Sequence, residues 1–366
     1  MKRLIELWNK YERHISVVTL VCGFTFDLIL AKRPDSIADN ILLLFYLGLS
    51  ASIIVVLNMR SRREQEGIQT VQPLFLLLVL QFCFGGLASN LLILYGKSGS
   101  LGGTTIFLAL LLCMLVGNEM LKNRYAQFKF NIGVYYFLLL TYLVIALPTF
   151  VFHRIGTQIF LVSGIVSLLL IAFFLWAIFR LVLRGDKKKQ ILQVGSIVLG
   201  IYVAFNGLYF LNVIPPVPLS LKAAGIYHSV ERTASGDYAV TYEKKHWWEF
   251  WRDTSDMFTV QAGEPAYCFS AVFAPGKLTT PIVHTWEYLY PADENHKRST
   301  WLPVAKVEFP ITGGREEGYR GFSEKRVLAD GQWRCTVSTA SGQVIGYITF
   351  NVVSATSTPA LSSGVL

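Results

Sequence analysis

The residues best suited to bind a ligand follow a Gly-Gly pair late in the chain. They combine cationic and aromatic side chains, namely Arg315, Tyr319, Arg320 and Lys325. An Arg guanidinium binds a carboxylate or phosphate through two parallel hydrogen bonds, so an anionic glycan or a lipid phosphate would suit this group. The alternative is that neighbouring acids neutralise the cations in a solvated hairpin, these acids being Glu316, Glu317 and Glu324.

A second candidate is an aromatic tract flanked by cations within residues 244–252. Its aromatic members are Trp247, Trp248, Phe250 and Trp251. Such residues suit the headgroup zone of a membrane, and aromatic faces also stack on sugars. The third interpretation, equally open, is that the tract covers the core of its own domain.

Three polar residues of the apolar segments fall in their outer half: Asp27, Asn90 and Asn206. One reading is a polar pocket in the outer half of a membrane bundle, as in a transporter or a lipid-handling enzyme. The other is hydrogen bonding between helices, with Asp27 near interfacial water. No nucleophile-elbow, Walker or zinc-protease motif occurs, and His284 and Glu287 lack further metal-ligand companions, so we expect no catalytic residues, metal or cofactor.

The elements that must position these residues begin with apolar runs. The chain has 366 residues, of which 53% are hydrophobic and 16% charged. Runs long enough to cross a membrane as helices are predicted at about 15–30, 40–58, 72–95, 102–121, 131–152, 157–182 and 191–213. The sequence therefore predicts a bundle of about seven transmembrane helices over residues 1–213, or six if the first run is a cleaved signal.

Charge predicts the orientation of this bundle. The net charge of the chain is +9, the sum of +10 for residues 1–213 and −1 for residues 214–366. With a cytoplasmic amino terminus, the inner segments carry fourteen cations and the outer loops four. The positive-inside rule thus favours that orientation, with the C-terminal domain outside. Because the basic excess belongs to membrane loops, membrane lipids are the expected partners and nucleic acid is not.

The pattern after the last span is that of a β domain. A Pro-rich tether is expected at 214–222, a β domain at 223–353 and a disordered tail at 354–366. Eight β-rich runs are separated by turn residues, namely 238–242, 257–261, 266–273, 282–290, 304–309, 319–325, 332–338 and 344–352. This pattern predicts an all-β sandwich.

Two cysteines refine that prediction. Cys268 and Cys335 fall on two predicted strands with Trp286 between them, a spacing similar to the bridged core of an immunoglobulin-like sandwich. A disulfide between them is one outcome and two free thiols the other, since an oxidising compartment permits the bond without placing the two thiols.

The C-terminal residues resemble a family. The run from Gly313 to Lys325, with Gly331 to Arg334 and Gly342 to Val352, is similar to DUF2914, a bacterial envelope domain family of unknown function. Its members often follow polytopic membrane regions. The resemblance implies a bacterial envelope location and a β fold, and it implies no activity. Together with the predicted orientation, we expect the chain in the bacterial cytoplasmic (inner) membrane with this domain in the periplasm. The expected role is binding of a glycan, a lipid headgroup or a protein partner.

Overall fold

The structure, a computed structural model, divides into a helical unit ending at Ile214 and a β unit from Pro215 to Leu366, each described here by itself. It describes residues 24, 25, 27, 28, 36–65, 74–98, 105–120, 127–181, 187–215, 219–245, 254–261, 263–275, 278–291, 299–315, 317–355 and 360–366.

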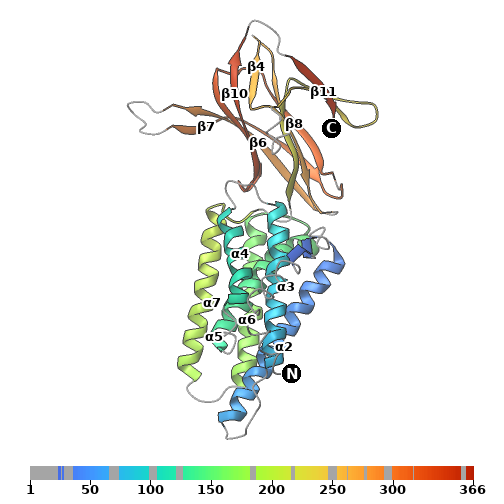
Figure 1. The fold of residues 1–366 in the computed structure, drawn as a ribbon. Coiled ribbons are helices and arrows are strands. Elements are labelled where there is room, and N and C mark those ends of the chain that lie inside the picture. The colour runs from blue at the N-terminus through green and yellow to red at the C-terminus, as the bar shows by residue number, and fades with distance from the viewer. Residues whose placement is uncertain are drawn as a thin grey trace, which may run out of the picture. The chain divides into compact units, whose positions relative to one another are not determined.

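The helical unit consists of long apolar helices (Figure 1). Its described elements are α2 (Ile37–Gln65), α3 (Leu74–Ser98), α4 (Thr105–Met120), α5 (Phe128–Ala146), the π-helical continuation η2 (Leu147–Phe152), α6 (Thr157–Leu181) and α7 (Lys187–Phe210). Each falls on one of the predicted spans.

The prediction of seven spans is not supported. Five helices within the described ranges are long and apolar enough to cross a membrane. The apolar part of α4 runs only from Thr105 to Gly117, which covers about 20 Å as a helix, whereas a hydrocarbon core needs about 30 Å. The first predicted span, 15–30, lies mostly outside the described residues. A multi-pass membrane protein remains the class that the helices define.

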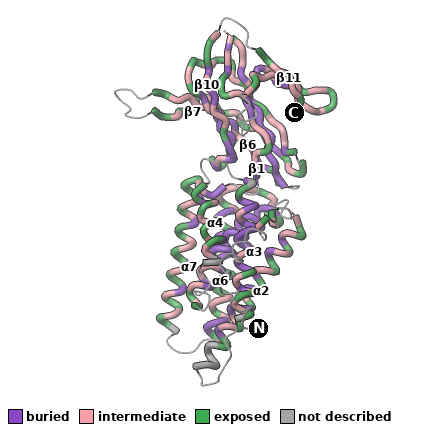
Figure 2. Tube along the Cα trace, viewed as in Figure 1, coloured by how far each residue is buried: buried purple, intermediate pink, exposed green. Residues whose placement is uncertain are grey.

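Helix α5 lies at the centre of its unit. Of its spanning window 78% is buried, against 17% for α7, which is mostly exposed or intermediate in Figure 2. Hydrogen bonds join α5 to three neighbouring helices. Tyr142 Oη donates to Asn40 Oδ1 of α2 at 3.3 Å, and the Thr141 carbonyl accepts from Tyr95 Oη of α3 at 3.0 Å. Tyr136 Oη bonds Ser167 Oγ of α6 at 3.3 Å. In an apolar solvent such bonds hold helices together.

Close glycine contacts complete the packing. A Cβ added at Gly164 of α6 would lie 2.9 Å from Cε2 of Tyr202 on α7, and one at Gly86 of α3 would lie 2.8 Å from Cε2 of Tyr46 on α2. Small residues let the rings approach the neighbouring backbone, as is usual between membrane helices.

Helix α7 ends by a capping motif. Asn212 takes φ 57°, the left-handed conformation, and the Val213 N–H donates to the Leu208 carbonyl at 2.9 Å. This is the Schellman pattern, in which Asn can replace Gly. The helix therefore ends at Phe210, before the Pro-rich tether begins.

Within its described residues the β unit contains eleven strands: β1 (Ser220–Tyr227), β2 (Ser229–Arg232), β3 (Tyr238–Glu243), β4 (Met257–Val260), β5 (Ala266–Phe273), β6 (Thr279–Tyr290), β7 (Thr300–Thr312), β8 (Tyr319–Lys325), β9 (Gly331–Thr339), β10 (Val344–Ser354) and β11 (Leu361–Val365). They form three sheets, with strand orders β1-β5-β8, β4-β10-β9-β6-β7 and β11-β3-β2. The β6–β7 hairpin extends beyond β9, because β9 pairs only with residues 282–288 of β6 (Figure 1).

Strand β5 shows that the sheets form three layers. Ala266 and Cys268 belong to the core shared with the five-stranded sheet, while Phe269 and Ala271 belong to the core shared with β2 and β3. Alternate residues of a strand point to opposite faces, so the β1-β5-β8 sheet is covered on both sides. The prediction of two layers therefore misses the small β11-β3-β2 sheet.

The eight predicted strands are all present, and β5 and β8 have the predicted bounds. Strands β1, β2 and β11 were not predicted. The expectation of a disordered tail at 354–366 is wrong for Leu361–Val365, which pairs antiparallel with β3. The free edge of β3 supplies the backbone partners that a Ser-rich segment needs to form a strand.

Candidate functional site

The four predicted ligand-binding residues do not form one site. Tyr319 packs against the buried cluster that includes Ile282, whereas Arg320 donates to Asp237 Oδ1 at 2.9 Å. Arg315 is exposed in the loop before β8, and Lys325 ends that strand. At about 3.3 Å per residue, Lys325 lies about 20 Å from Tyr319.

The neutralising partners differ from those expected. Asp237 pairs with Arg320, and Glu324 pairs with Arg326, while Glu316 lies outside the described residues. The hydrogen bond from Arg320 lowers the pKa of Asp237 below its usual range. Arg320 is therefore engaged by a residue 83 positions earlier, which local sequence cannot indicate.

The aromatic tract is the second predicted contact site. Its residues, Trp247, Trp248, Phe250 and Trp251, lie outside the described residues. Their contact with a membrane or a glycan stays a prediction.

Two of the three intramembrane polar residues lie together. The Asp27 carboxylate lies beside Ser89 and Asn90 of α3. Asn206 instead donates to the Tyr202 carbonyl of its own helix at 2.8 Å, and Asn90 likewise donates to Gly86 at 2.9 Å. Within the described residues no hydrogen bond joins Asn206 to the other two, which favours local bonding over a shared pocket.

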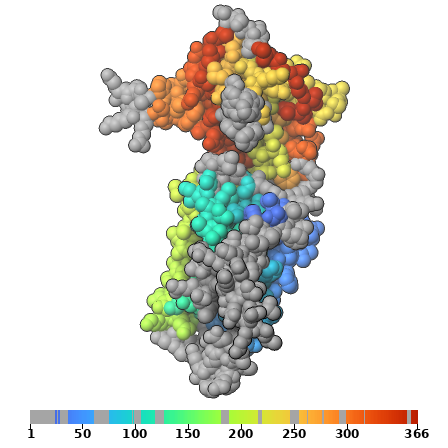
Figure 3. All heavy atoms as spheres, viewed as in Figure 1, coloured from blue at the N-terminus to red at the C-terminus, as the bar shows by residue number. Residues whose placement is uncertain are grey.

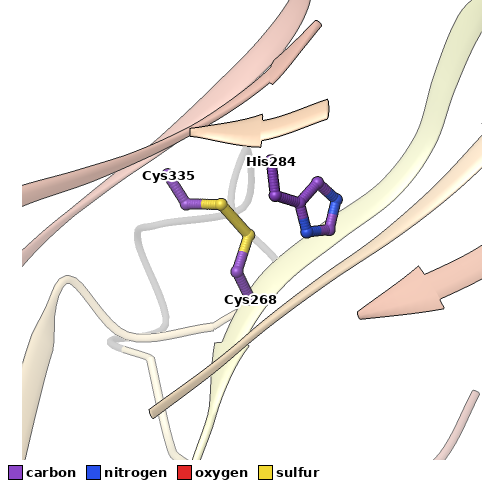
Figure 4. A group of neighbouring side chains, drawn as sticks. All are labelled: Cys268, His284 and Cys335. Carbon is purple, nitrogen blue, oxygen red and sulfur yellow. A yellow bond between two sulfur atoms is a disulfide. The ribbon is translucent and has the colours of Figure 1, made fainter. Parts of the chain in front are cut away.

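Cys268 and Cys335 form a disulfide with a Cα–Cα distance of 6.5 Å (Figure 4). The bond joins β5 of one sheet to β9 of the next. His284 completes a group whose potential ligand atoms lie within 4.8 Å of one another. Both sulfur atoms are used in the disulfide, so this group offers no thiolate to a metal.

His284 belongs to a buried polar network between the two sheets. Its Nε2 bonds Ser270 Oγ of β5 at 2.8 Å, and its Nδ1 bonds Ser323 Oγ of β8 at 3.0 Å. Trp286 Nε1 also donates to Ser323 Oγ at 3.0 Å. Burial lowers the pKa of His284 to about 4, so the ring is neutral and structural. His284 and Trp286, two positions apart on β6, lie on one face of the strand and are both fully buried.

A second histidine is held between two acids. His228, at the β1–β2 junction, bonds Glu264 Oε1 through Nδ1 at 3.0 Å and Glu243 Oε1 through Nε2 at 3.2 Å. Burial lowers the pKa of His228, but the bonds to Glu243 and Glu264 outweigh it and raise the pKa overall. The Glu243 carboxylate also accepts from the Thr259 N–H, so it ties three segments together.

The most complete surface constellation lies on the outer face of the five-stranded sheet. Arg334 of β9 donates from Nε to Glu287 Oε2 at 2.7 Å and from Nη2 to Glu287 Oε1 at 2.9 Å. Its guanidinium carbon lies 4.6 Å from the ring centroid of Trp301 on β7 and 5.6 Å from that of Tyr347 on β10. Thr336 also donates to Glu287. We call these five residues the Arg334 platform.

The platform combines planar faces with fixed polar groups. Both Arg334 nitrogens bonded to Glu287 are held in a fork geometry, which fixes the guanidinium between the two rings. The side chain of Tyr347 is exposed, and that of Trp301 is half-buried. Aromatic rings beside fixed donors and acceptors suit a ligand that presents both C–H faces and hydroxyl groups.

Sequence reasoning missed the platform because its residues come from four strands. The signal that could have found Arg334 is the alternation in Trp333, Arg334 and Cys335, where a charged residue sits between two buried ones. Glu287 lies opposite Arg334 in the β6–β9 register. Such a cross-strand partner can be identified only once the order of the strands in the sheet is known.

Comparison with known proteins confirms the resemblance of the C-terminal region. Residues 279–352 match the family described as "Protein of unknown function (DUF2914)". All five platform residues fall in this range. The fusion to a membrane region agrees with the apolar helices. No curated protein matches the chain.

Solved structures give only distant similarities. An immunoglobulin-like protein from Pseudomonas aeruginosa is 12% identical, with 37% of this chain and 98% of that chain covered and a TM-score of 0.21. A beta-glucosidase from Listeria innocua is 12% identical. The match covers 26% of this chain and 14% of the glucosidase chain, with a TM-score of 0.19. The chain thus spans about 14% of the length of that glucosidase. At these scores neither similarity carries an argument about fold or function.

Proposed function

We propose that this protein is a multi-pass protein of the bacterial cytoplasmic (inner) membrane whose periplasmic β domain binds an envelope glycan at the Arg334 platform. The observation that carries the proposal is the Arg334 guanidinium held by Glu287 between the Trp301 and Tyr347 rings. Orientation follows from the cation distribution of the sequence, with the amino terminus in the cytoplasm.

A glycan suits the platform better than a lipid headgroup. The charge of Arg334 is already matched by Glu287 in a two-bond pair, so the surface does not present a free cation to a phosphate. It presents aromatic carbon and polar atoms that hydroxyl groups can meet. Because the sheet fixes these side chains in advance, binding orders few groups and loses little entropy.

The platform also suits a glycan better than a protein partner. Protein interfaces of stable complexes bury roughly 800 Å² on each side, centred on apolar anchors. The platform is small and polar for that role, since Arg334, Glu287 and Thr336 make up most of it. Binding of a protein partner is the outcome that the experiment below can reveal instead.

The domain itself is proposed to be an immunoglobulin-like sandwich with an added layer. The Cys268–Cys335 bond joins two sheets, and Trp286 lies directly opposite Cys335 in register. A bridged pair of strands with a buried Trp is the hallmark of that fold. The β11-β3-β2 sheet is the addition.

Binding of peptidoglycan fragments to the full chain in nanodiscs tests the proposal. We expect Trp301→Ala and Tyr347→Ala each to weaken binding about 5- to 150-fold, since stacking of a ring is worth about 1–3 kcal/mol where it has been measured on bases. The matched control is Phe322→Ala, an exposed aromatic on the β1-β5-β8 sheet. Equal affinity of all three variants and the wild type would refute the platform as the site.

A further inference from the structure

An apolar groove lies between α4, α5 and α7 of the helical unit. Its volume is about 500 Å³, within the range of ligand sites. Its lining is Leu110 and Met114 of α4, Lys129, Phe130, Gly133, Val134 and Phe137 of α5, and Ile197, Ile201, Ala204, Phe205 and Leu208 of α7. Both α4 (turquoise) and α7 (yellow-green) reach the surface on the face drawn in Figure 3.

The lining is apolar except at one end. Lys129 is the one charged residue among the lining residues, and its side chain is exposed at the start of α5. Gly133 keeps the groove open one turn further along, because a Cβ there would already contact Ile197 Cγ2 at 3.4 Å. The groove therefore has a cationic mouth and an apolar interior.

The mouth lies at a basic end of the unit. Phe128, at the start of α5, contacts Phe179 near the end of α6 with ring centroids 6.1 Å apart, so these two ends are neighbours. Helix α7 starts six residues after α6 ends and brings exposed Lys188 to this end. Membrane surfaces rich in anionic lipid attract such cations, each by about 1 kcal/mol.

The dimensions decide between a lipid chain and a helix. The groove follows α5 for about 12 Å from Lys129 to Phe137 and α7 for about 17 Å from Ile197 to Leu208, so its 500 Å³ is spread over a long, narrow space. A helix with its side chains is about 10–12 Å wide and does not fit. An extended hydrocarbon chain does.

We propose that this groove binds one acyl chain of an anionic phospholipid whose phosphate is held by Lys129. The lipid fills apolar volume between α4, α5 and α7 and ties these helices together. Its headgroup lies at the basic end of the unit, opposite in charge to Lys129.

Native mass spectrometry of the full chain, carrying phosphatidylglycerol or phosphatidylcholine, tests this site. Ala204→Phe places a ring in the groove, whereas Val203→Phe places it on the exposed side of the same helix. We expect Ala204→Phe to lose the retained lipid and Val203→Phe to keep it. Equal retention of lipid by the two variants would overturn the proposal.

The headgroup contact has its own pair of variants. Lys129→Gln should lower retention of phosphatidylglycerol about fivefold, because one cation near an anionic surface contributes about 1 kcal/mol of attraction. Retention of phosphatidylcholine should stay unchanged. Lys188→Gln is the matched control outside the groove. An equal effect of both lysines would show general surface attraction and overturn the assignment of the phosphate to Lys129.

Photo-crosslinking decides the matter if Ala204→Phe fails to fold. Phosphatidylglycerol with a photoreactive group in one acyl chain, added to the wild-type chain, should label residues of α4, α5 and α7 that line the groove. Labelling confined to the exposed face of α6 would overturn the proposal. Insertion of another protein segment would appear as an absence of lipid labelling in the groove.

Discussion

The guanidinium carbon of Arg334 lies 4.6 Å from the ring centroid of Trp301, and Glu287 holds it there through two hydrogen bonds. We expect Glu287→Gln to release the Arg334 side chain and lower the free energy of unfolding by about 1.5–3 kcal/mol, the range for hydrogen bonds to charged groups. Urea unfolding of the full chain measures this. Glu324→Gln, which breaks an exposed pair with Arg326, should cost less than about 0.5 kcal/mol. Equal losses in both variants would contradict a special role for Glu287.

His228 makes the stability of the β unit pH-dependent. The His228 pKa is raised above its reference value of 6.5, so its contribution is complete below that pH and is lost as the pH rises through the folded-state pKa. The pKa of Glu243, also in the cluster, is lowered, so its contribution is lost as the pH falls through its folded-state pKa. Stability should therefore peak between these limits.

The variant His228→Gln tests whether His228 causes the loss of stability at higher pH. Gln can still donate to one carboxylate, but it does not titrate. We expect the fall of the unfolding midpoint above pH 6.5 to disappear in this variant, while the fall in acid remains because Glu243 still titrates. An unchanged profile on the alkaline side would assign the titration to another group.

The disulfide joins residues 67 positions apart. Cys268→Ser with Cys335→Ser should lower the free energy of unfolding by about 2–4 kcal/mol, because the bond restricts the unfolded chain. Alkylation of the wild type should modify neither residue until a reductant is added. Cys113→Ser, at an exposed free thiol, serves as the control. Alkylation of Cys268 without reductant would refute the bond.

The proposed orientation has a direct test in reporter fusions. Fusions after Lys129 and after Lys189 should report the cytoplasm, and fusions after Lys97 and after Lys222 the exterior. The reason is the cation content of the loops concerned. An exterior signal after Lys189 would reverse the assignment, since Arg184 and Lys187–Lys189, at the start of α7, form the densest cationic block.

Strand positions were largely predictable, because alternation and turn residues are local signals. Ala266–Phe273 and Tyr319–Lys325 are apolar or alternating runs bounded by Pro or Gly, and both have the predicted bounds. Strand β1 was missed because Ala223, Ala224 and Gly225 have low β propensity. Its place is set by pairing with β5, which no local pattern reveals.

The proposed binding surface was not predictable for the same physical reason. Arg315, Tyr319, Arg320 and Lys325 were grouped by nearness in sequence, and the period of two along β8 separates Tyr319 and Arg320 onto opposite faces. Arg334 and Trp301 become neighbours only through the order β10-β9-β6-β7. The sequence indicates which strands exist, while their order decides which side chains meet.

Fluorine NMR of the full chain with 5-fluorotryptophan tests the glycan site most directly. On addition of peptidoglycan fragments, we predict that the Trp301 resonance, assigned with Trp301→Phe, shifts while that of the buried Trp286 does not. A Trp301 resonance that stays unchanged while those of Trp247, Trp248 or Trp251 shift would contradict the account and move the site to the aromatic tract.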